Sequence, residues 1–273
     1  MSAKAFTKRV DLDGIARRLL DADDAARPVP PITEELPELS IADAYTIQRV
    51  GRELRQARAE RLVGRKVGLT SAAMQEQLGV RQPDFGYLTA GMVLQSGAEL
   101  PVRGLIAPRV EAEIAFKLRQ PLRGAAVTRE EVLAATAEVA PALEVIDSRI
   151  ADWRITIADT IADNASSGRV VLGGFRPLDE LDLAAVRAEL EVGPVGAVAR
   201  ETVAGRGDAV LGHPAEAVAW LARALFEYDE AIAAGEVVLP GAMARALTLT
   251  PGDTAVARME GLGEVAVSME GRG

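Results

Sequence analysis

The chain has 273 residues, of which 49% are hydrophobic and 26% are charged, as expected for a folded globular protein. Its net charge of −9 disfavours binding to nucleic acid or to anionic lipid. Cysteine is absent, which excludes disulfides, thiolate metal sites and cysteine nucleophiles. No apolar run reaches the length of a membrane span, and residues 1–10 lack the apolar core of a signal peptide, so a cytoplasmic protein is expected.

The first sixty or so residues are predicted to be mainly helical. Residues 11–26 have the apolar spacing of a helix, with Ile15, Leu19 and Leu20 on one side, and the proline-rich connector 27–37 breaks it. Ser40 and Asp43 then have the spacing of a capping box for a helix that runs to about Arg61.

The rest of the chain changes to short β-like runs separated by Gly and Pro. Strands are predicted at residues 65–69, 110–118, 142–146, 170–172, 190–192, 237–239, 246–249, 254–259 and 264–268. Only two helices are predicted between them, at 129–139 behind a Thr128–Glu131 capping box and at 215–226. Many strands, few helices and no regular alternation predict an α+β fold around a folded sheet.

Three glutamates stand in apolar strands where a charge needs a partner. In the segment 110–116 (VEAEIAF), the period of two places Glu111 and Glu113 on one face. Glu144 is the single charge of a second apolar strand, ALEVI. An isolated E-x-E also fits an exposed strand face with two solvated acids. If the carboxylates are buried, however, they require a cation, water or a shared proton.

The composition indicates which ion these carboxylates would hold. With no cysteine and one histidine in the chain, hard oxygen coordination of Mg²⁺ or Mn²⁺ is favoured over zinc. Lys66, in the segment 64–71 (GRKVGLTS), stands beside a glycine that permits close backbone approach. A buried lysine there could stabilise an enolate or transfer a proton, although most lysines are simply solvated.

Other chemistries have little support. The patterns G-x-x-x-x-G-K-[ST], G-x-G-x-x-G and G-x-S-x-G do not occur. His213, the only histidine, precedes a predicted helix and is interpreted as a helix cap or loop residue, which disfavours a Ser-His-Asp triad. The segment 159–168 (DTIADNASSG), considered alone, is typical of an ordinary polar turn.

Seven blocks, taken in order, resemble one family. They are GRKVGLTS at 64–71, QLGVRQPDFGYL at 77–88, PRVEAEIAF at 108–116, PALEVIDSRIADW at 141–153, DTIADNASSG at 159–168, LGHPAEAVAWLARAL at 211–225 and LPGAMARALTLTPGD at 239–253. Together they closely resemble the 2-oxopent-4-enoate (2-hydroxypenta-2,4-dienoate) hydratases. They are also similar to the 4-oxalocrotonate decarboxylases and the 2-oxohept-3-enedioate hydratases, all within the fumarylacetoacetase superfamily.

The resemblance implies a fold and a set of site residues. The expected architecture is a mostly helical part at 1–63 and a fumarylacetoacetase-like mixed β-roll or sandwich core at 64–273. Metal ligation of Mg²⁺ or Mn²⁺ is implied for Glu111, Glu113 and Glu144, catalysis for Lys66 and Asp84, and substrate contact for Ser166, Leu69 and Thr70. Ser167 is a weaker candidate. A homo-oligomer is also implied, and a complex with a neighbouring pathway enzyme is compatible with the resemblance.

The implied reaction is hydration in the meta-cleavage catabolism of aromatic compounds. Mg²⁺ chelated by the 1-carboxylate and 2-oxo oxygen would stabilise a dienolate, after which C5 is protonated and water adds at C4 to give 4-hydroxy-2-oxopentanoate. Lys66 is expected to stabilise charge or shuttle a proton, and Asp84 to act as general acid and base.

Three alternatives remain open from the sequence. A 4-oxalocrotonate-type decarboxylase would use the same metal chelate, although Asp84 in PDFG and the GRKVG segment look more like the hydratases. A C–C hydrolase of acylpyruvates would need a His–Glu type of base, for which His213 is poorly placed. A metal-stabilised, non-catalytic partner subunit is the third, and the presence of both Lys66 and Asp84 argues against it.

Overall fold

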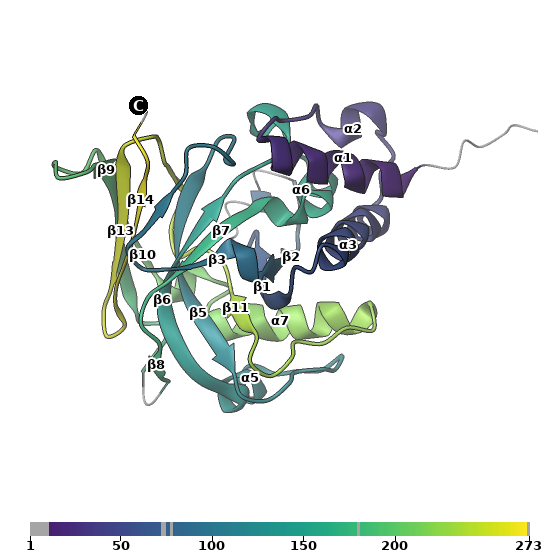
Figure 1. Cartoon of the computed structure of the whole chain (residues 1–273). Helices are drawn as coiled ribbons and strands as arrows, with labels where there is room; N and C mark the ends of the chain where they lie inside the picture. The colour runs from purple at the N-terminus through teal and green to yellow at the C-terminus, as the bar shows by residue number, and fades with distance from the viewer. Residues whose placement is uncertain (1–10, 72–74, 77–78, 179–180, 272–273) are drawn as a thin grey trace, which may run out of the picture.

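The computed structural model describes residues 11–71, 75–76, 79–178 and 181–271 (Figure 1). Residues 1–10, to which the signal-peptide argument applies, lie outside the described residues, as do Gln77 and Leu78 at the beginning of the 77–88 block. Among the described helices, none has the length and apolarity needed to cross a membrane.

The N-terminal part is mainly helical, as predicted. Helix α1 (Leu12–Ala25) is capped by Asp11, and α3 (Ile41–Ala57) is capped by Ser40, whose hydroxyl accepts a hydrogen bond from the Asp43 amide. The proline-rich connector contains a single helical turn, α2 (Ile32–Glu35), that was not predicted. Helix α3 ends before the predicted Arg61, because the chain enters the central sheet at Leu62.

A mixed sheet of nine strands, counted over the described residues, forms the centre of the molecule. Its main path is β2–β1–β11–β5–β6–β7–β3, with β12 beside β5 and β8 beside β6. The strands are β1 (Leu62–Gly68), β2 (Asp84–Thr89), β3 (Val93–Gln95), β5 (Arg109–Leu118), β6 (Thr136–Ile146), β7 (Ser167–Leu172), β8 (Arg176–Pro177), β11 (Val237–Leu239) and β12 (Leu247–Thr248).

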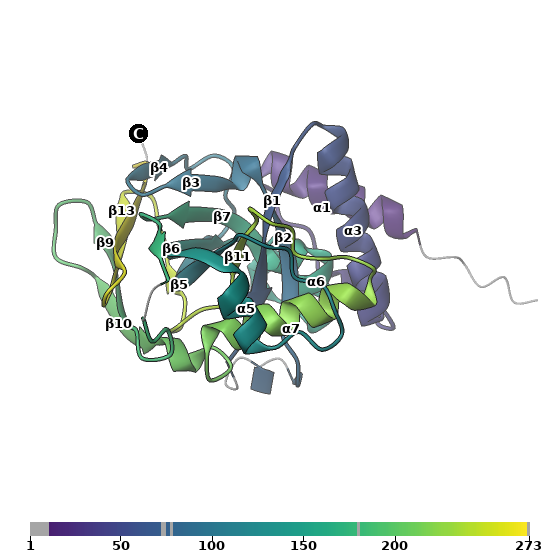
Figure 2. The same ribbon diagram turned by 90° about the horizontal axis from the view of Figure 1, so that it is seen from below.

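A smaller five-stranded sheet lies beside the central sheet, on the side away from α1 and α3 (Figures 1 and 2). It contains β10 (Glu201–Arg206), β9 (Arg187–Pro194), β13 (Asp253–Met259), β14 (Gly263–Met269) and β4 (Ala98–Leu100), in that order. Apolar side chains that alternate along β13, such as Ala255 and Ala257, are fully buried in the core shared with the central sheet. This arrangement confirms the predicted α+β class.

Two local predictions were wrong. The predicted helix 129–139 is a helix only in α5 (Arg129–Ala135), because the chain becomes a strand at Thr136 and pairs with β5. The Thr128–Glu131 capping box that begins α5 is present. The segment 159–168 is also not an ordinary turn, since it contains most of helix α6 (Ile157–Ala162) and a 3-10 turn at Asn164–Ser166.

The remaining described helix, α7 (Pro214–Glu227), extends the predicted 215–226 by one residue at each end. Strands β2, β3, β4, β8 and β10 were not predicted. Most of these are short, and β2 contains Gly86, so they lack the apolar alternation that would identify them. Pairing with neighbouring strands, not local pattern, defines them.

The helical part is tied to the core by Gln48 of α3. Its side-chain amide donates hydrogen bonds to the carbonyls of Phe85 in β2, at 2.8 Å, and of Ile161 in α6, at 2.9 Å. Gln48 is buried, so water cannot replace these bonds. One side chain therefore joins α3 to the two elements that carry Asp84 and Thr160.

Replacing Gln48 with Ala should lower the free energy of unfolding by roughly 1–3 kcal/mol, because two buried carbonyls lose their donor. Chemical denaturation followed by circular dichroism measures this change. Gln56→Ala is the matched control, since Gln56 is an exposed glutamine on the same helix. Equal losses for the two variants would show that the Gln48 hydrogen bonds do not tie the helices to the core.

Candidate active site and metal centre

The three glutamates converge at the middle of the central sheet. Glu111 and Glu113 extend from the same face of β5, and Glu144 is the direct cross-strand partner of Glu111 on β6. One carboxylate oxygen from each lies within 4.8 Å of the others. All three are buried, and Glu113 has no exposed surface at all. The arrangement therefore excludes the interpretation as two solvated acids on an exposed strand.

Lys66 and Asp84 join this cluster from the edge of the same sheet. Antiparallel pairing of β1 with β2 places Gly68 opposite Asp84. The Lys66 ammonium lies 3.4 Å from Glu144 Oε1 and donates a hydrogen bond of 2.9 Å to the carbonyl of Ala165. One buried ammonium thus faces the carboxylates of Asp84 and the three glutamates.

The excess of negative charge is reflected in the pKa values. Burial raises the pKa of Glu111 to about 7, and Glu144 adds to this effect while Lys66 opposes it. Burial, with Glu144 and Glu111, raises the pKa of Glu113 well above its ordinary value. Burial alone would lower the pKa of Lys66, but the carboxylates, Glu144 first, outweigh it and raise the pKa. The surrounding carboxylates therefore favour the charged form of Lys66.

Several carboxylate oxygens of the cluster lack a donor. Glu113 Oε2 accepts a hydrogen bond of 2.7 Å from the Gly241 amide. Its Oε1, both oxygens of Glu144 and Oδ1 of Asp84 are buried without any hydrogen bond from the described residues. Buried carboxylate oxygens without hydrogen bonds are costly, and the ion pair between Lys66 and Glu144 Oε1 offsets only part of this cost. Oxygen donors, full burial and uncompensated negative charge together fit a hard divalent cation at the glutamates.

A cavity of about 280 Å³ opens beside the cluster. Its wall includes every residue for which a catalytic or substrate-binding role was expected: Lys66, Leu69, Thr70, Asp84 and Ser166, together with Glu111. Other parts of the wall are formed by Arg109, Ile146, Trp153, Ile155, Thr160, Ala165, Ala242 and Arg245. Ser167, the weaker candidate, lines a different cavity on the side of α1 and α3.

Glycine allows the close packing of this wall. A Cβ atom on Gly68 would lie 2.2 Å from Asp84 Oδ1 and 3.3 Å from Lys66 Nζ. Gly241, which binds Glu113 through its amide, has a φ of 115° and lies against Thr70. Larger residues at these two positions would displace the groups that form the site.

Some residues of the candidate site were missed from the sequence. The hydroxyl of Thr160 donates to Asp84 Oδ2 and also lies 3.4 Å from Ser166 Oγ, so it links two predicted site residues. The Ala165 carbonyl accepts the hydrogen bond from Lys66. Because this acceptor is a backbone atom, the type of residue at position 165 could not reveal it. Arg109 precedes Glu111 by two residues on β5, and the period of two would have placed it on the glutamate face.

His213 lies outside this site. Its Nδ1 accepts a hydrogen bond of 3.0 Å from the Ala215 amide and so caps α7, and burial lowers its pKa. It is not among the residues that line the cavity. The interpretation of His213 as a helix cap is confirmed, and a His–Glu base for C–C hydrolysis is absent from the described part of the cavity wall.

The fold and this site can be compared with those of known proteins to identify the family of the chain. Residues 55–269 match the family described as fumarylacetoacetate hydrolase, C-terminal. The 2-hydroxyhexa-2,4-dienoate hydratase of Comamonas testosteroni is 45% identical over 98% of this chain and 98% of its own length. The 2-keto-4-pentenoate hydratase of Paraburkholderia phymatum is 41% identical over 94% and 97% of the two chains. The chain therefore belongs to the fumarylacetoacetate hydrolase family, in the branch that contains these hydratases.

Solved structures agree with this assignment. The 4-oxalocrotonate decarboxylase of Pseudomonas putida G7, complexed with magnesium and adipate, superimposes with a TM-score of 0.90 at 36% identity, over 94% of this chain and 97% of that chain. The fumarylpyruvate hydrolase of Pseudomonas aeruginosa, in complex with Mn²⁺ and pyruvate, has a TM-score of 0.60 at 18% identity, over 78% and 90%. The second comparison shows a shared fold only. The predicted fumarylacetoacetase-like core is confirmed.

Replacing His213 with Asn should leave enzymatic turnover within about twofold of the wild type, because Asn is also a good helix cap and His213 does not reach the cavity. Steady-state kinetics with the substrate proposed below would measure this. A loss of turnover at unchanged thermal stability would place His213 in the chemistry and revive the C–C hydrolase reading.

Proposed function

We propose that this protein is a metal-dependent hydratase that adds water to 2-hydroxypenta-2,4-dienoate, the enol of 2-oxopent-4-enoate, and yields 4-hydroxy-2-oxopentanoate. The observation that carries the proposal is the meeting of Glu111, Glu113 and Glu144 with Lys66 and Asp84 beside one cavity. The proposal is supported by this geometry and by sequence similarity: the chain is 45% and 41% identical, over nearly its full length, to two relatives that are named hydratases. The proposed setting is the meta-cleavage catabolism of aromatic compounds.

Glu111, Glu113 and Glu144 would hold the ion, with Mg²⁺ as the proposed metal and Mn²⁺ as an alternative. When bound, a divalent ion supplies positive charge that attracts the substrate's carboxylate and 2-oxo oxygen and stabilises negative charge on that oxygen. Three carboxylates also leave room for such a chelating ligand, since Mg²⁺ normally has six oxygen ligands. The magnesium complex of the similar 4-oxalocrotonate decarboxylase supports a divalent ion.

Lys66 is proposed to stabilise charge or to shuttle a proton at the cavity. The Ala165 carbonyl and Glu144 hold its ammonium, so its position does not depend on the substrate. A fixed ammonium next to the reacting oxygen favours the enolate-like form of the substrate over the neutral one.

Asp84 is proposed to be the general acid and base. Its Oδ2 is held by the hydroxyl of Thr160, while Oδ1 makes no hydrogen bond with the described residues and can carry a proton. Burial raises the pKa of Asp84, against the effect of Lys66, which favours this protonated form. The carboxyl group can give its proton to C5 and later accept one from the water that adds at C4, while the proton that leaves the 2-hydroxyl group is balanced by the proton that C3 gains.

The substrate is proposed to contact the remaining wall of the cavity. Ser166 offers a hydroxyl, and Leu69 and Thr70 approach from the end of β1. Trp153 and Ile155 provide apolar surface for the hydrocarbon end of a short dienoate. The proposal also includes a homo-oligomer in the cytoplasm and a complex with a neighbouring enzyme of the pathway, which light scattering and co-purification can test.

Purified protein with Mg²⁺ and freshly generated 2-hydroxypenta-2,4-dienoate should produce 4-hydroxy-2-oxopentanoate, identified by NMR. The parallel incubation uses 4-oxalocrotonate and measures CO₂. Release of CO₂ without hydration of the dienoate would replace the proposal with a decarboxylase, which the similarity to the Pseudomonas putida G7 enzyme makes the second candidate.

Replacing Glu111 with Gln should lower kcat by at least about a hundredfold, because a neutral amide is a weak ligand for the ion. The fold should persist, since the change removes one of three adjacent like charges. Glu138→Gln is the control: Glu138 is on β6, the strand paired with β5, but its carboxylate pairs with Lys117 near the surface. Unchanged turnover in Glu111→Gln would remove the metal-site proposal.

A further inference from the structure

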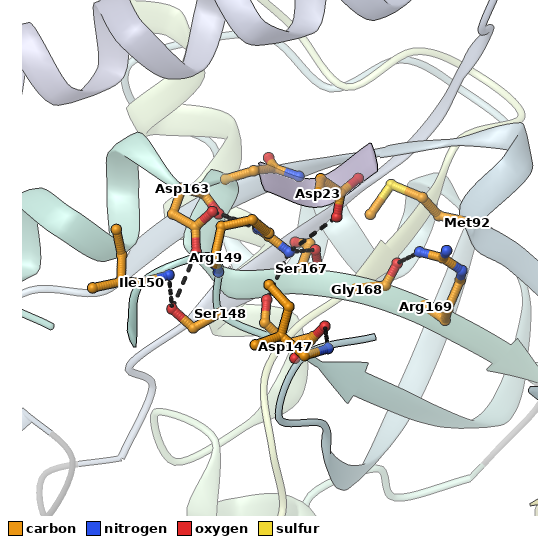
Figure 3. A network of polar contacts seen from close by, with 12 residues as sticks. Asp23, Met92, Asp147, Ser148, Arg149, Ile150, Asp163, Ser167, Gly168 and Arg169 are labelled. Carbon is orange, nitrogen blue, oxygen red and sulfur yellow. Dashed lines mark hydrogen bonds and ion pairs between the residues drawn. The ribbon is translucent and has the colours of Figure 1, made fainter. Parts of the chain in front are cut away.

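A buried ion pair lies next to the turn Asn164–Ser166, outside the cavity that contains Lys66 and Asp84. Arg149 follows β6, and Asp163 follows α6; they are 4% and 2% exposed. The Arg149 Nε atom donates a hydrogen bond of 2.5 Å to Asp163 Oδ1, and the Arg149 amide donates one of 2.9 Å to Oδ2 (Figure 3). Neither residue lines the cavity that contains Lys66 and Asp84.

The same guanidinium binds the backbone at both ends of the turn Asn164–Ser166. Its Nη2 donates to the Asp163 carbonyl at 2.5 Å, and its Nη1 donates to the Ser167 carbonyl at 2.8 Å. Figure 3 shows Arg149 between Asp163 and Ser167, with Asp147 nearby at the end of β6. Nη1 also donates to the Asp147 carbonyl at 2.6 Å. One side chain therefore fixes the residues on both sides of the turn to the end of β6.

The turn itself has an unusual backbone. Asn164, Ala165 and Ser166 have φ values of 54°, 50° and 53°, a left-handed conformation that residues other than glycine rarely adopt. The Asn164 side chain accepts a hydrogen bond from the Tyr87 amide at 2.8 Å and donates one to the Tyr87 carbonyl at 3.0 Å. Such a conformation persists only where its surroundings hold it.

The turn presents two groups to the active site. Its Ala165 carbonyl accepts the hydrogen bond from the Lys66 ammonium, and its Ser166 residue lines the cavity. The Ser166 carbonyl, in turn, accepts a hydrogen bond of 2.9 Å from the Asp147 amide. A change in the turn would therefore move the acceptor of Lys66 and the Ser166 hydroxyl together.

We propose that Arg149 and Asp163 are positioning residues for the proposed hydration, because they hold the turn Asn164–Ser166 in the conformation that places Lys66 and Ser166. The inference rests on the proposed function. Arginine is required because a planar guanidinium can bind a carboxylate and three carbonyls at once. A lysine keeps the charge but has three donors on a single nitrogen and cannot reach these separate acceptors.

The experiment compares the wild type with Arg149→Lys under saturating Mg²⁺ and 2-hydroxypenta-2,4-dienoate. The kcat of the variant should fall by about tenfold or more, because Lys66 and Ser166 are no longer held in place. The Kd for Mn²⁺, measured by calorimetry without substrate, should stay within about twofold, since the glutamates are on β5 and β6. A merely structural role would weaken metal binding and turnover together.

Arg200→Lys is the matched control. Arg200 makes a similar two-pronged contact with Asp253, at 2.7 Å and 2.8 Å, but in the smaller sheet. Its kcat should remain within about twofold of the wild type. If Arg149→Lys does not fold, Asp163→Asn takes its place, because this change preserves the shape of the side chain and removes its negative charge. The same two quantities, kcat and the Kd for Mn²⁺, are then measured.

The outcomes separate the inference from the function on which it rests. No hydration by the wild type would reject the proposed function itself. If the wild type is active and the folded Arg149→Lys variant has an unchanged kcat, the positioning role alone is overturned. Asp163→Asn takes the place of Arg149→Lys in this comparison if the latter does not fold. A parallel loss of kcat and Mn²⁺ affinity would overturn it as well, by showing that the pair supports the whole site.

Discussion

The burial of several like charges at one point of a sheet is the constraint on which this structure depends. Glu111 and Glu144 are direct cross-strand partners, a pairing that repels when both are charged. A slip of one residue between β5 and β6 would turn the glutamates of one strand to the opposite face. Long, continuous pairing of these two strands keeps the cluster together, and the energy of ion binding can offset its cost.

The other groups of the site come from segments that are remote in sequence, and backbone contacts bring them together. Gly68 allows Asp84 to approach Lys66, and the turn Asn164–Ser166 supplies the carbonyl that orients the ammonium. Left-handed residues other than glycine cost about 1–3 kcal/mol each. Hydrogen bonds from Asn164 and Arg149 offset this cost, so the turn is stable only as part of the assembled site.

Local patterns predicted the parts of the site that lie within one element. The period of two identified Glu111 and Glu113 as neighbours, and an unusual charge in an apolar strand identified Glu144. The pairing of Glu144 with Glu111 depends on strand register, which no local pattern contains. The same limit explains the wrong end of α5: Ala135 has no glycine or proline directly after it, and the strand that begins at Thr136 is fixed by pairing with β5. For Asp84 and Ser166, only the family resemblance pointed to the site.

Hydration and decarboxylation differ in the proton transfers that they require, and so in the acid–base groups that the cavity wall must provide. Both reactions pass through an enolate that the same carboxylate-held ion can stabilise. Hydration, however, must also deliver protons to carbon and remove one from water, which requires an acid–base group beside the hydrocarbon chain. Asp84 is the residue proposed for this role, with one oxygen held by Thr160 and the other without a hydrogen bond in the described part of the chain. If Asp84 has the proposed role, the choice between the two reactions depends more on its placement than on the three glutamates, which serve both reactions.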